Sequence, residues 1–103
     1  MESERTVEQA LKRAVEKAGG CCYKFTSPSM AGVPDRIVVL RGRVVFVELK
    51  ATREKPRVLQ RAVAKTIRKA GGRVYCLSSV EQVTSFVKTL RRRFPQEQDY
   101  DDI

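Results

Sequence analysis

Two short apolar runs on either side of a glycine-containing turn constrain the fold of this chain most strongly. The runs span residues 37–40 and 44–47, and an Arg-Gly-Arg segment separates them. Runs of this kind, rich in β-branched residues, predict a β-hairpin. Both runs are apolar on both faces, which is typical of strands that are covered on each side. The sequence therefore predicts a hairpin inside a sheet that has helices on both of its faces.

Charged side chains lie at the open end of this hairpin. Asp35 precedes its first strand, and Glu48 and Lys50 lie at the end of its second strand. A two-residue or four-residue turn places Asp35 opposite Glu48, and opposed residues of antiparallel strands share a face of the sheet. Lys50, two positions after Glu48, projects from the same face. A three-residue turn would shift the pairing by one position and move Asp35 to the other face.

The composition indicates a single soluble domain, and we expect no organic cofactor. The chain has 103 residues, of which 42% are hydrophobic, as in globular proteins. We expect neither a membrane span nor a signal peptide, because no apolar run is long enough. Histidine is absent, which excludes a histidine base and histidine-bound zinc. The three cysteines lack metal-binding spacing, so a metal site would use oxygen ligands, which favours Mg²⁺ or Mn²⁺.

The charge is strongly basic and unevenly distributed. The chain has 21 basic and 12 acidic residues, a net charge of +9, and four of the acids lie in residues 96–103. Residues 1–95 therefore carry +13, which predicts a polyanionic partner such as nucleic acid; the alternative is a basic surface that serves only solubility. We expect residues 1–95 to form one domain and residues 96–103 to be a disordered acidic tail.

Hydrophobic periodicity predicts an α/β domain with the element order α-β-β-β-α-β-α. The strand after the second helix follows a helical crossover, so we expect it to join the hairpin in one mixed sheet, parallel to a hairpin strand. Besides the hairpin, the predicted helices and strands span residues 7–18, 21–25, 56–70, 73–77 and 80–90.

The charged set at the hairpin end has two interpretations. Two carboxylates that hold one or two Mg²⁺ ions can promote hydrolysis of a phosphodiester, because the ions activate water and neutralise phosphate charge. A lysine beside them can orient the water or stabilise developing charge. Alternatively, Asp35 caps the preceding loop and Glu48 forms a strand-end salt bridge with Lys50, since charged strand ends are common. The spacing alone favours neither interpretation.

Two longer motifs resemble a known family. Gly-Val-Pro-Asp-Arg at residues 32–36, followed by Phe-Val-Glu-Leu-Lys at residues 46–50, resembles the PD-(D/E)XK nuclease superfamily and, within it, the VRR-NUC family. The likeness covers about residues 5–85. It implies a restriction-endonuclease-like core and a Mg²⁺- or Mn²⁺-dependent DNA endonuclease that selects branched, flapped or junction DNA. The alternative function is a non-catalytic nucleic-acid-binding module that uses the basic faces.

The resemblance also implies roles for individual residues. Asp35 and Glu48 would be catalytic metal ligands, with the Leu49 carbonyl beside them, and Lys50 would be the catalytic lysine. Glu8 would be an accessory acid at the metal, and Lys24 and Gln60 would support the substrate; a plain surface position is the alternative for these three. The DNA-binding residues are predicted to be Arg36, Arg53, Lys55, Arg57, Arg61, Lys65 and Arg68.

Small free-standing members of this family occur in phages and bacteria and tend to be homodimers. The resemblance therefore implies a homodimer in the cytoplasm of a bacterial or phage-infected cell. The third helix is the predicted source of the interface, through Phe86, Leu90 and Phe94. The alternative is that these three side chains close the core of their own protomer.

Overall fold

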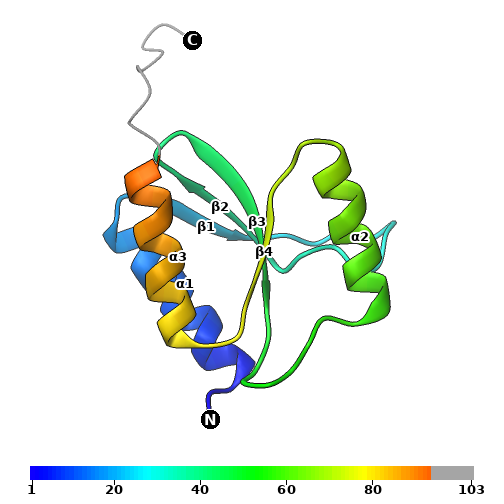
Figure 1. Ribbon diagram of the computed structural model, residues 1–103, viewed down its shortest axis with the longest axis horizontal. Coiled ribbons are helices and arrows are strands. Elements are labelled where there is room, and N and C mark those ends of the chain that lie inside the picture. Colours follow the sequence, from blue (N-terminus) through cyan, green and yellow to red (C-terminus); the bar gives the residue numbers. More distant parts are fainter. Residues whose placement is uncertain (94–103) are drawn as a thin grey trace, which may run out of the picture.

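The computed structural model describes residues 1–93, so the predicted tail at residues 96–103 lies outside the described part. The order of elements confirms the predicted α-β-β-β-α-β-α arrangement (Figure 1). None of the helices in residues 1–93 is long and apolar enough to cross a membrane. The elements are α1 (Glu4–Lys17), β1 (Cys21–Lys24), β2 (Arg36–Leu40), β3 (Arg43–Leu49), α2 (Val58–Lys69), β4 (Val74–Leu77) and α3 (Val80–Arg93).

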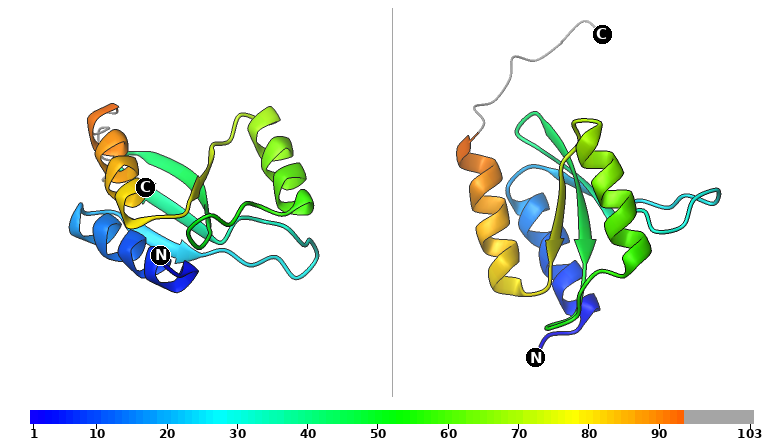
Figure 2. Two further views of the ribbon diagram at one scale, coloured as in Figure 1. Left: turned by 60° about the horizontal axis from the view of Figure 1, so that its bottom comes forward. Right: turned by 45° about the vertical axis from the view of Figure 1, so that its right-hand side comes forward.

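The four strands form one mixed sheet in the order β1-β2-β3-β4. Strand β2 is antiparallel to both β1 and β3, and β4 is parallel to β3, as the crossover through α2 predicts. Helices α1 and α3 pack side by side against one face of the sheet, whereas α2 lies on the other side, next to β4 (Figure 2). The predicted sheet with helices on both faces is therefore confirmed.

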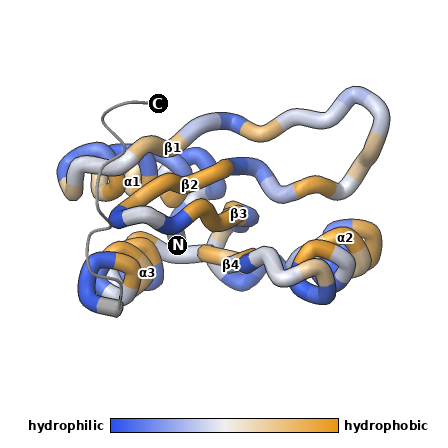
Figure 3. The backbone as a smooth tube through the Cα atoms, turned by 90° about the horizontal axis from the view of Figure 1, so that it is seen from above, coloured by the Kyte–Doolittle hydropathy of each residue, from blue (hydrophilic) through white to orange (hydrophobic). Residues whose placement is uncertain are grey.

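The core lies between the sheet and the pair α1 and α3. Strands β2 and β3 are strongly hydrophobic along their length (Figure 3), and alternate residues of both strands are buried against the two helices. Phe86 and Leu90 of α3 are 6% and 0% exposed within this core. The prediction that these two side chains contribute to a dimer interface is therefore wrong, because their own protomer buries them. Phe94 lies outside the described residues.

The hairpin turn has the two-residue form that the pairing argument requires. Arg41 and Gly42 have φ angles of 54° and 79°, and positive φ at both central positions is a feature of type I′ turns. An arginine in this conformation costs about 1 kcal/mol or more. The turn pairs Ile37 with Phe46 along the ladder. The predicted register is confirmed. The last pair of the ladder joins Arg36 to Val47, and Asp35 and Glu48 lie directly beyond it.

Two helices begin at other residues than the apolar periodicity predicts. Helix α1 begins at Glu4, three residues early, because the Ser3 hydroxyl accepts a hydrogen bond of 3.1 Å from the Thr6 N–H and caps the helix. Helix α2 begins two residues after Pro56, because Arg57 has an extended backbone and occupies the cap position. The early start of α1 brings an additional acid, Glu4, into the helix.

Candidate active site

Hydrogen bonds of its side chain and its carbonyl tie Asp35 to the end of β3 and to the residue that follows β1. Oδ2 of Asp35 accepts a hydrogen bond of 2.8 Å from the Leu49 N–H, and the Asp35 carbonyl accepts one of 2.9 Å from Phe25. The N–H of Lys50 donates to the Leu77 carbonyl at 2.9 Å, which keeps the chain beside β4 after β3 ends. The structure therefore brings Asp35, Glu48 and Lys50 to one place, as the hairpin register predicts.

The loop before Asp35 is fixed by close packing at a glycine. Gly32 has a φ of 85°, and a Cβ atom at this position would lie only 2.8 Å from Cγ of Leu59. Glycine is required here for both reasons, since side chains are strained at such a φ and no space remains for one. This contact ties the loop to the first turn of α2. The chain is thereby fixed directly before Pro34 and Asp35.

Glu48 is a buried carboxylate with one oxygen that accepts no hydrogen bond. The residue is only 4% exposed, and its Oε2 lies 3.5 Å from Nζ of Lys50 but accepts no hydrogen bond within the described residues. Burial raises the pKa of Glu48 from 4.5 to about 7; the Asp35 carboxylate also raises it, whereas Lys50 opposes the shift. A buried carboxyl group with an oxygen that accepts no hydrogen bond is well suited to binding a cation, which would stabilise its charged form.

The donor atoms at this position suit a hard divalent cation. Asp35 and Glu48 offer carboxylate oxygens, which Mg²⁺ and Mn²⁺ prefer. Residues 1–93 contain no group of three or more His, Cys, Asp or Glu side chains that could hold a metal ion by themselves. The residues present still fit Mg²⁺, because this ion usually binds one or two carboxylates and takes its remaining ligands from water and substrate phosphates.

Glu8 lies in a different environment from the one predicted. Its Oε2 accepts a hydrogen bond of 2.9 Å from Nε of Arg36, and Nη1 of Arg36 donates to the Cys22 carbonyl at 3.2 Å. Arg36 follows Asp35 directly, and successive side chains of a strand point to opposite faces, so Arg36 lies on the α1 side of the sheet. At 8% exposure, its guanidinium is too buried to contact a phosphate. The assignment of Arg36 to the DNA-binding set is corrected accordingly.

Glu4 is the acid of α1 whose charge interacts with Asp35 and Lys50. The Glu2 N–H donates to Oγ1 of Thr52 at 2.8 Å, and the Thr52 N–H donates to the Glu2 carbonyl at 2.9 Å. These bonds place the first turn of α1 beside the segment that follows Lys50. The pKa of Glu4 is raised, mainly by burial and then by Asp35, while Lys50 lowers it. Sequence reasoning missed Glu4, although Ser3 is a recognisable helix cap.

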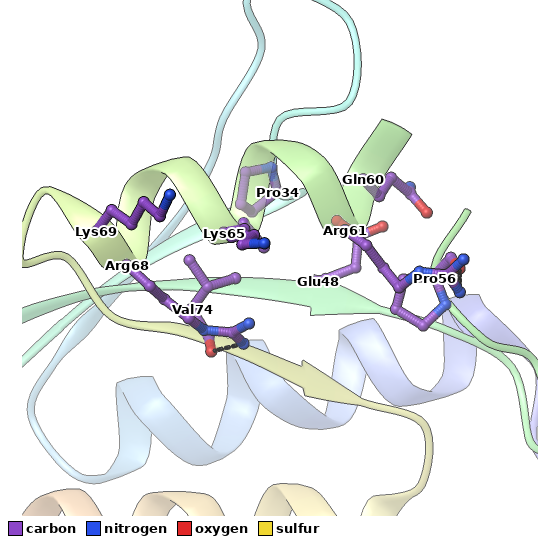
Figure 4. A pocket seen from close by; sticks show the side chains of 10 residues that line it. Pro34, Glu48, Pro56, Gln60, Arg61, Lys65, Arg68, Lys69 and Val74 are labelled. Atoms are coloured by element: carbon purple, nitrogen blue, oxygen red, sulfur yellow. Dashed lines mark hydrogen bonds between the residues drawn. The ribbon is translucent and has the colours of Figure 1, made fainter. Parts of the chain in front are cut away.

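A groove of about 530 Å³ runs between α2 and the sheet, with Glu48 in its lining (Figure 4). Two arginines at the groove are positioned by backbone carbonyls: Arg61 donates to Pro56 at 3.2 Å, and Arg68 donates to Val74 at 2.6 Å. Lys69 was not predicted, although it continues the four-residue spacing from Arg61 through Lys65. The basic residues that line the groove are Arg61, Lys65, Arg68 and Lys69.

The other predicted residues are divided between this groove and the surface. Gln60 lines the groove, and its Oε1 accepts a hydrogen bond of 2.8 Å from the Arg57 N–H, which ties it to the start of α2. Lys24 is exposed and lies opposite Arg36 in the register of β1 and β2. It therefore leaves the sheet on the face opposite Glu48. Arg53, Lys55 and Arg57 are exposed before α2 and are not among the groove-lining residues.

Glu48→Gln should stabilise the metal-free protein at alkaline pH. The pKa of Glu48 is about 7 in the folded protein, against an ordinary value of 4.5. Between these pH values only the native state retains the proton, so the free energy of unfolding falls as pH rises. The loss amounts to about 1–3 kcal/mol, and glutamine does not undergo it. Urea unfolding in EDTA at pH 5 and pH 8 measures the difference, with Glu16→Gln, at an exposed position of α1, as the control. The same pH dependence in wild type and Glu48→Gln would contradict this prediction.

Comparison with known proteins places the chain in a family. No protein-family model matches it. A solved structure described as a VRR_NUC domain matches with a TM-score of 0.78 and 31% identity, covering 85% of this chain and 97% of that one. The protein named "Putative nuclease p44" of Acyrthosiphon pisum secondary endosymbiont phage 1 is 52% identical over 54 residues, which are 52% of this chain and 58% of the relative. The chain thus matches just over half of that relative's length.

The chain belongs to the VRR-NUC family. The structural match spans nearly the whole of the solved domain, and the α/β fold with a mixed four-stranded sheet is the one expected of the PD-(D/E)XK superfamily. The family resemblance and the fold class predicted from residues 32–36 and 46–50 are therefore both confirmed.

Proposed function

We propose that this protein is a Mg²⁺- or Mn²⁺-dependent DNA endonuclease that hydrolyses phosphodiester bonds in branched, flapped or junction DNA. The observation that supports this most strongly is the buried Glu48 carboxylate, whose Oε2 accepts no hydrogen bond and is held 3.5 Å from the Lys50 ammonium, in a groove with four basic side chains. A module that only binds nucleic acid has no need of adjacent carboxylates near its phosphate-binding surface, since they repel both each other and the phosphate. The relative described as a nuclease is consistent with this function.

In this proposal Asp35 and Glu48 hold the metal, with the Leu49 carbonyl as a further oxygen donor, and Glu4 acts as an accessory acid through a water molecule on the metal, because residues 1–93 place no third acidic side chain within direct reach. When bound, the ion lowers the pKa of a water molecule and neutralises charge on the phosphate. The charge of Glu4 interacts with those of Asp35 and Lys50, whereas Glu8 is paired with Arg36, which favours Glu4 over Glu8 as the accessory acid. Gln60 supports the start of α2, and Lys24 lies on the opposite face of the sheet from Glu48.

Lys50 provides positive charge next to the carboxylates. Its ammonium is held 3.5 Å from Glu48 in a largely buried position, where electrostatic interactions are stronger than in water. An ammonium fixed in this way can donate a hydrogen bond to a phosphate oxygen or to the attacking water and stabilise charge that develops during cleavage. The basic side chains along α2 would hold the sugar–phosphate backbone without reading the bases.

A panel of labelled substrates tests the proposed function. Duplex, single strand, 5′ flap, 3′ flap and four-way junction would each be incubated with Mg²⁺, Mn²⁺ or EDTA. We expect cleavage of at least one branched substrate with a metal ion and none with EDTA. Binding without cleavage under every condition would contradict the proposal and favour the non-catalytic binding module.

The Arg61→Glu/Lys65→Glu double variant should weaken binding to all DNA sequences equally. Both side chains line the groove beside Glu48, and phosphate contacts carry no base specificity. Each lost contact should reduce the slope of log affinity against log salt by about 0.9 on duplex DNA. Affinity is measured in EDTA across a salt series, with Arg13→Glu/Lys17→Glu on the exposed side of α1 as a matched control. An unchanged slope in the groove variant would mean that DNA binds elsewhere.

The proposal includes a symmetric homodimer, because one chain provides one carboxylate site and cutting both strands of a junction requires two. Twofold dimers are the commonest oligomers. Phe86 and Leu90 cannot form the interface, whereas Tyr23 and Val44, on the sheet face that carries Glu48, are 63% and 59% exposed. Sedimentation at micromolar concentrations should give the mass of two chains, and Val44→Glu should give one. A wild-type monomer with and without junction DNA would contradict the dimer.

A further inference from the structure

A second group of basic side chains surrounds a hollow at the other end of the sheet. The hollow has a volume of about 310 Å³ and lies between the hairpin turn and the last turns of α3. The residues that line it are Arg41, Lys88, Arg91 and Arg92. Helix α3 packs on the opposite side of the sheet from α2 (Figure 2). This basic hollow is therefore separate from the groove that contains Glu48.

No acid of the described residues forms an ion pair with the side chains of the basic hollow. Among the described side chains, ion pairs form only at Lys12–Glu16, Arg36–Glu8 and Lys50–Glu48, so none of the four lining residues takes part in one. Basic residues near a helix C-terminus are stabilised by the helix dipole, which accounts for Arg91 and Arg92. It does not account for Lys88, more than one turn earlier, or for Arg41, on another element. An anion between the four would remove their mutual repulsion.

Arg41 provides a second, independent observation. It occupies the first central position of the hairpin turn with a φ of 54°, a conformation that favours asparagine or glycine. Strained backbone at a residue with a long side chain points to a role for that side chain. The side chain of Arg41 reaches the hollow from the turn, while the other three reach it from α3.

We propose that the basic hollow binds the phosphate backbone of a second segment of the nucleic-acid substrate, away from the bond that is cleaved. This inference rests on the proposed function and adds to it a source of substrate selection. DNA bound along α2 lies on the other side of the sheet from the hollow. Contact with the hollow therefore requires another arm of a branched DNA, or a DNA strand that continues around the hairpin end of the protein. Short substrates would occupy the groove alone, whereas branched substrates would occupy both surfaces.

The Lys88→Gln/Arg92→Gln double variant tests this inference. It removes two charges and retains apolar stems, and Arg13→Gln/Lys17→Gln on α1 removes two exposed charges elsewhere as the control. Affinity is measured in EDTA, across a salt series, for a four-way junction and for a short duplex. We expect weaker junction binding, with the salt slope reduced by up to about 1.8 for two contacts, and unchanged binding and cleavage of the short duplex. The control should alter neither substrate.

Several outcomes would overturn the inference. Unchanged junction affinity and slope would exclude the contact, and equal weakening on both substrates would mean that the hollow does not select a second segment. A variant with a neutral tail (Glu97→Gln, Asp99→Asn, Asp101→Asn and Asp102→Asn) tests the competing occupant. If loss of Lys88 and Arg92 affects junction binding only when the tail is acidic, the tail and not DNA occupies the hollow. Wild-type protein that binds no DNA would instead contradict the proposed function itself.

Discussion

Asp35→Ala and Glu48→Ala should each abolish metal-dependent cleavage, with a loss of about 10³-fold or more, because each removes an oxygen ligand from a site that has few others. Oδ2 of Asp35 already accepts from the Leu49 N–H, and Oε2 of Glu48 has no hydrogen-bond donor within residues 1–93. Calorimetric titration with Mn²⁺ should show weaker binding in both variants. Asp35→Asn and Glu48→Gln, which keep the shape of each side chain, should behave in the same way. Mn²⁺ binding that is unchanged in all four variants would rule out this site.

The same titration separates Glu4 from Glu8. Glu4→Gln should weaken Mn²⁺ binding and slow cleavage, because Glu4 lies in the field of Asp35 and Lys50. Glu8→Gln should instead reduce stability, because it leaves the buried guanidinium of Arg36 without its carboxylate partner. A loss of metal binding in Glu8→Gln with none in Glu4→Gln would return the accessory role to Glu8.

Lys50→Ala should lower the turnover rate by about 10²-fold or more while DNA affinity changes far less. The ammonium is held beside Glu48 and is largely buried, so it acts where charge develops in the transition state and contributes little to the exposed binding surface. Single-turnover rates and binding constants in EDTA measure the two effects separately.

Lys65→Ala is the matched comparison for Lys50→Ala. Lys65 is an exposed lysine that lines the same groove from α2, so its loss should reduce affinity and leave the rate at saturation nearly unchanged. If Lys50→Ala produced the same pattern as Lys65→Ala, Lys50 would be a phosphate contact and its proposed role in the chemistry would be wrong.

The position of the carboxylate pair could be predicted because it depends on local rules. Apolar alternation and a short turn determine the pairing in a hairpin, and the observed pairing of Ile37 with Phe46 follows from them. The residues that flank the ladder, Asp35 and Glu48, are then placed without knowledge of the remaining chain. The crossover through α2 adds β4 beside β3 by an equally general rule.

The accessory acid could not be chosen from local rules. Glu4 and Glu8 lie one turn apart on the same side of α1, so helical periodicity does not distinguish them. The distinction comes from contacts that are distant in sequence: Thr52 holds the N-terminus beside the active-site segment, and Arg36 engages Glu8. The burial of Arg36 could not be predicted from local rules either. An arginine is ordinarily a surface residue, and nothing in the Gly-Val-Pro-Asp-Arg segment itself indicates otherwise.

The partner of an amphipathic helix is also undetermined by its sequence. The apolar stripe of α3 would suit either a second protomer or its own core. Packing against α1 and the sheet buries Phe86 and Leu90, which leaves no apolar surface at these positions. Exposed apolar side chains lie elsewhere, among them Tyr23 and Val44, on the strands of the α2 side of the sheet that lie away from α2, which contacts β4.

Cleavage of a labelled four-way junction by the wild type and by Glu48→Gln, with Mn²⁺ and with EDTA, tests the central claim most directly. Glu48→Gln retains the shape of the site and should be at least as stable as the wild type at pH 8, so loss of activity cannot be attributed to unfolding. We predict that the wild type cleaves with Mn²⁺ and not with EDTA, and that the variant cleaves under neither condition. Cleavage by Glu48→Gln at the wild-type rate would contradict the assignment of Asp35, Glu48 and Lys50 as a metal-dependent nuclease site.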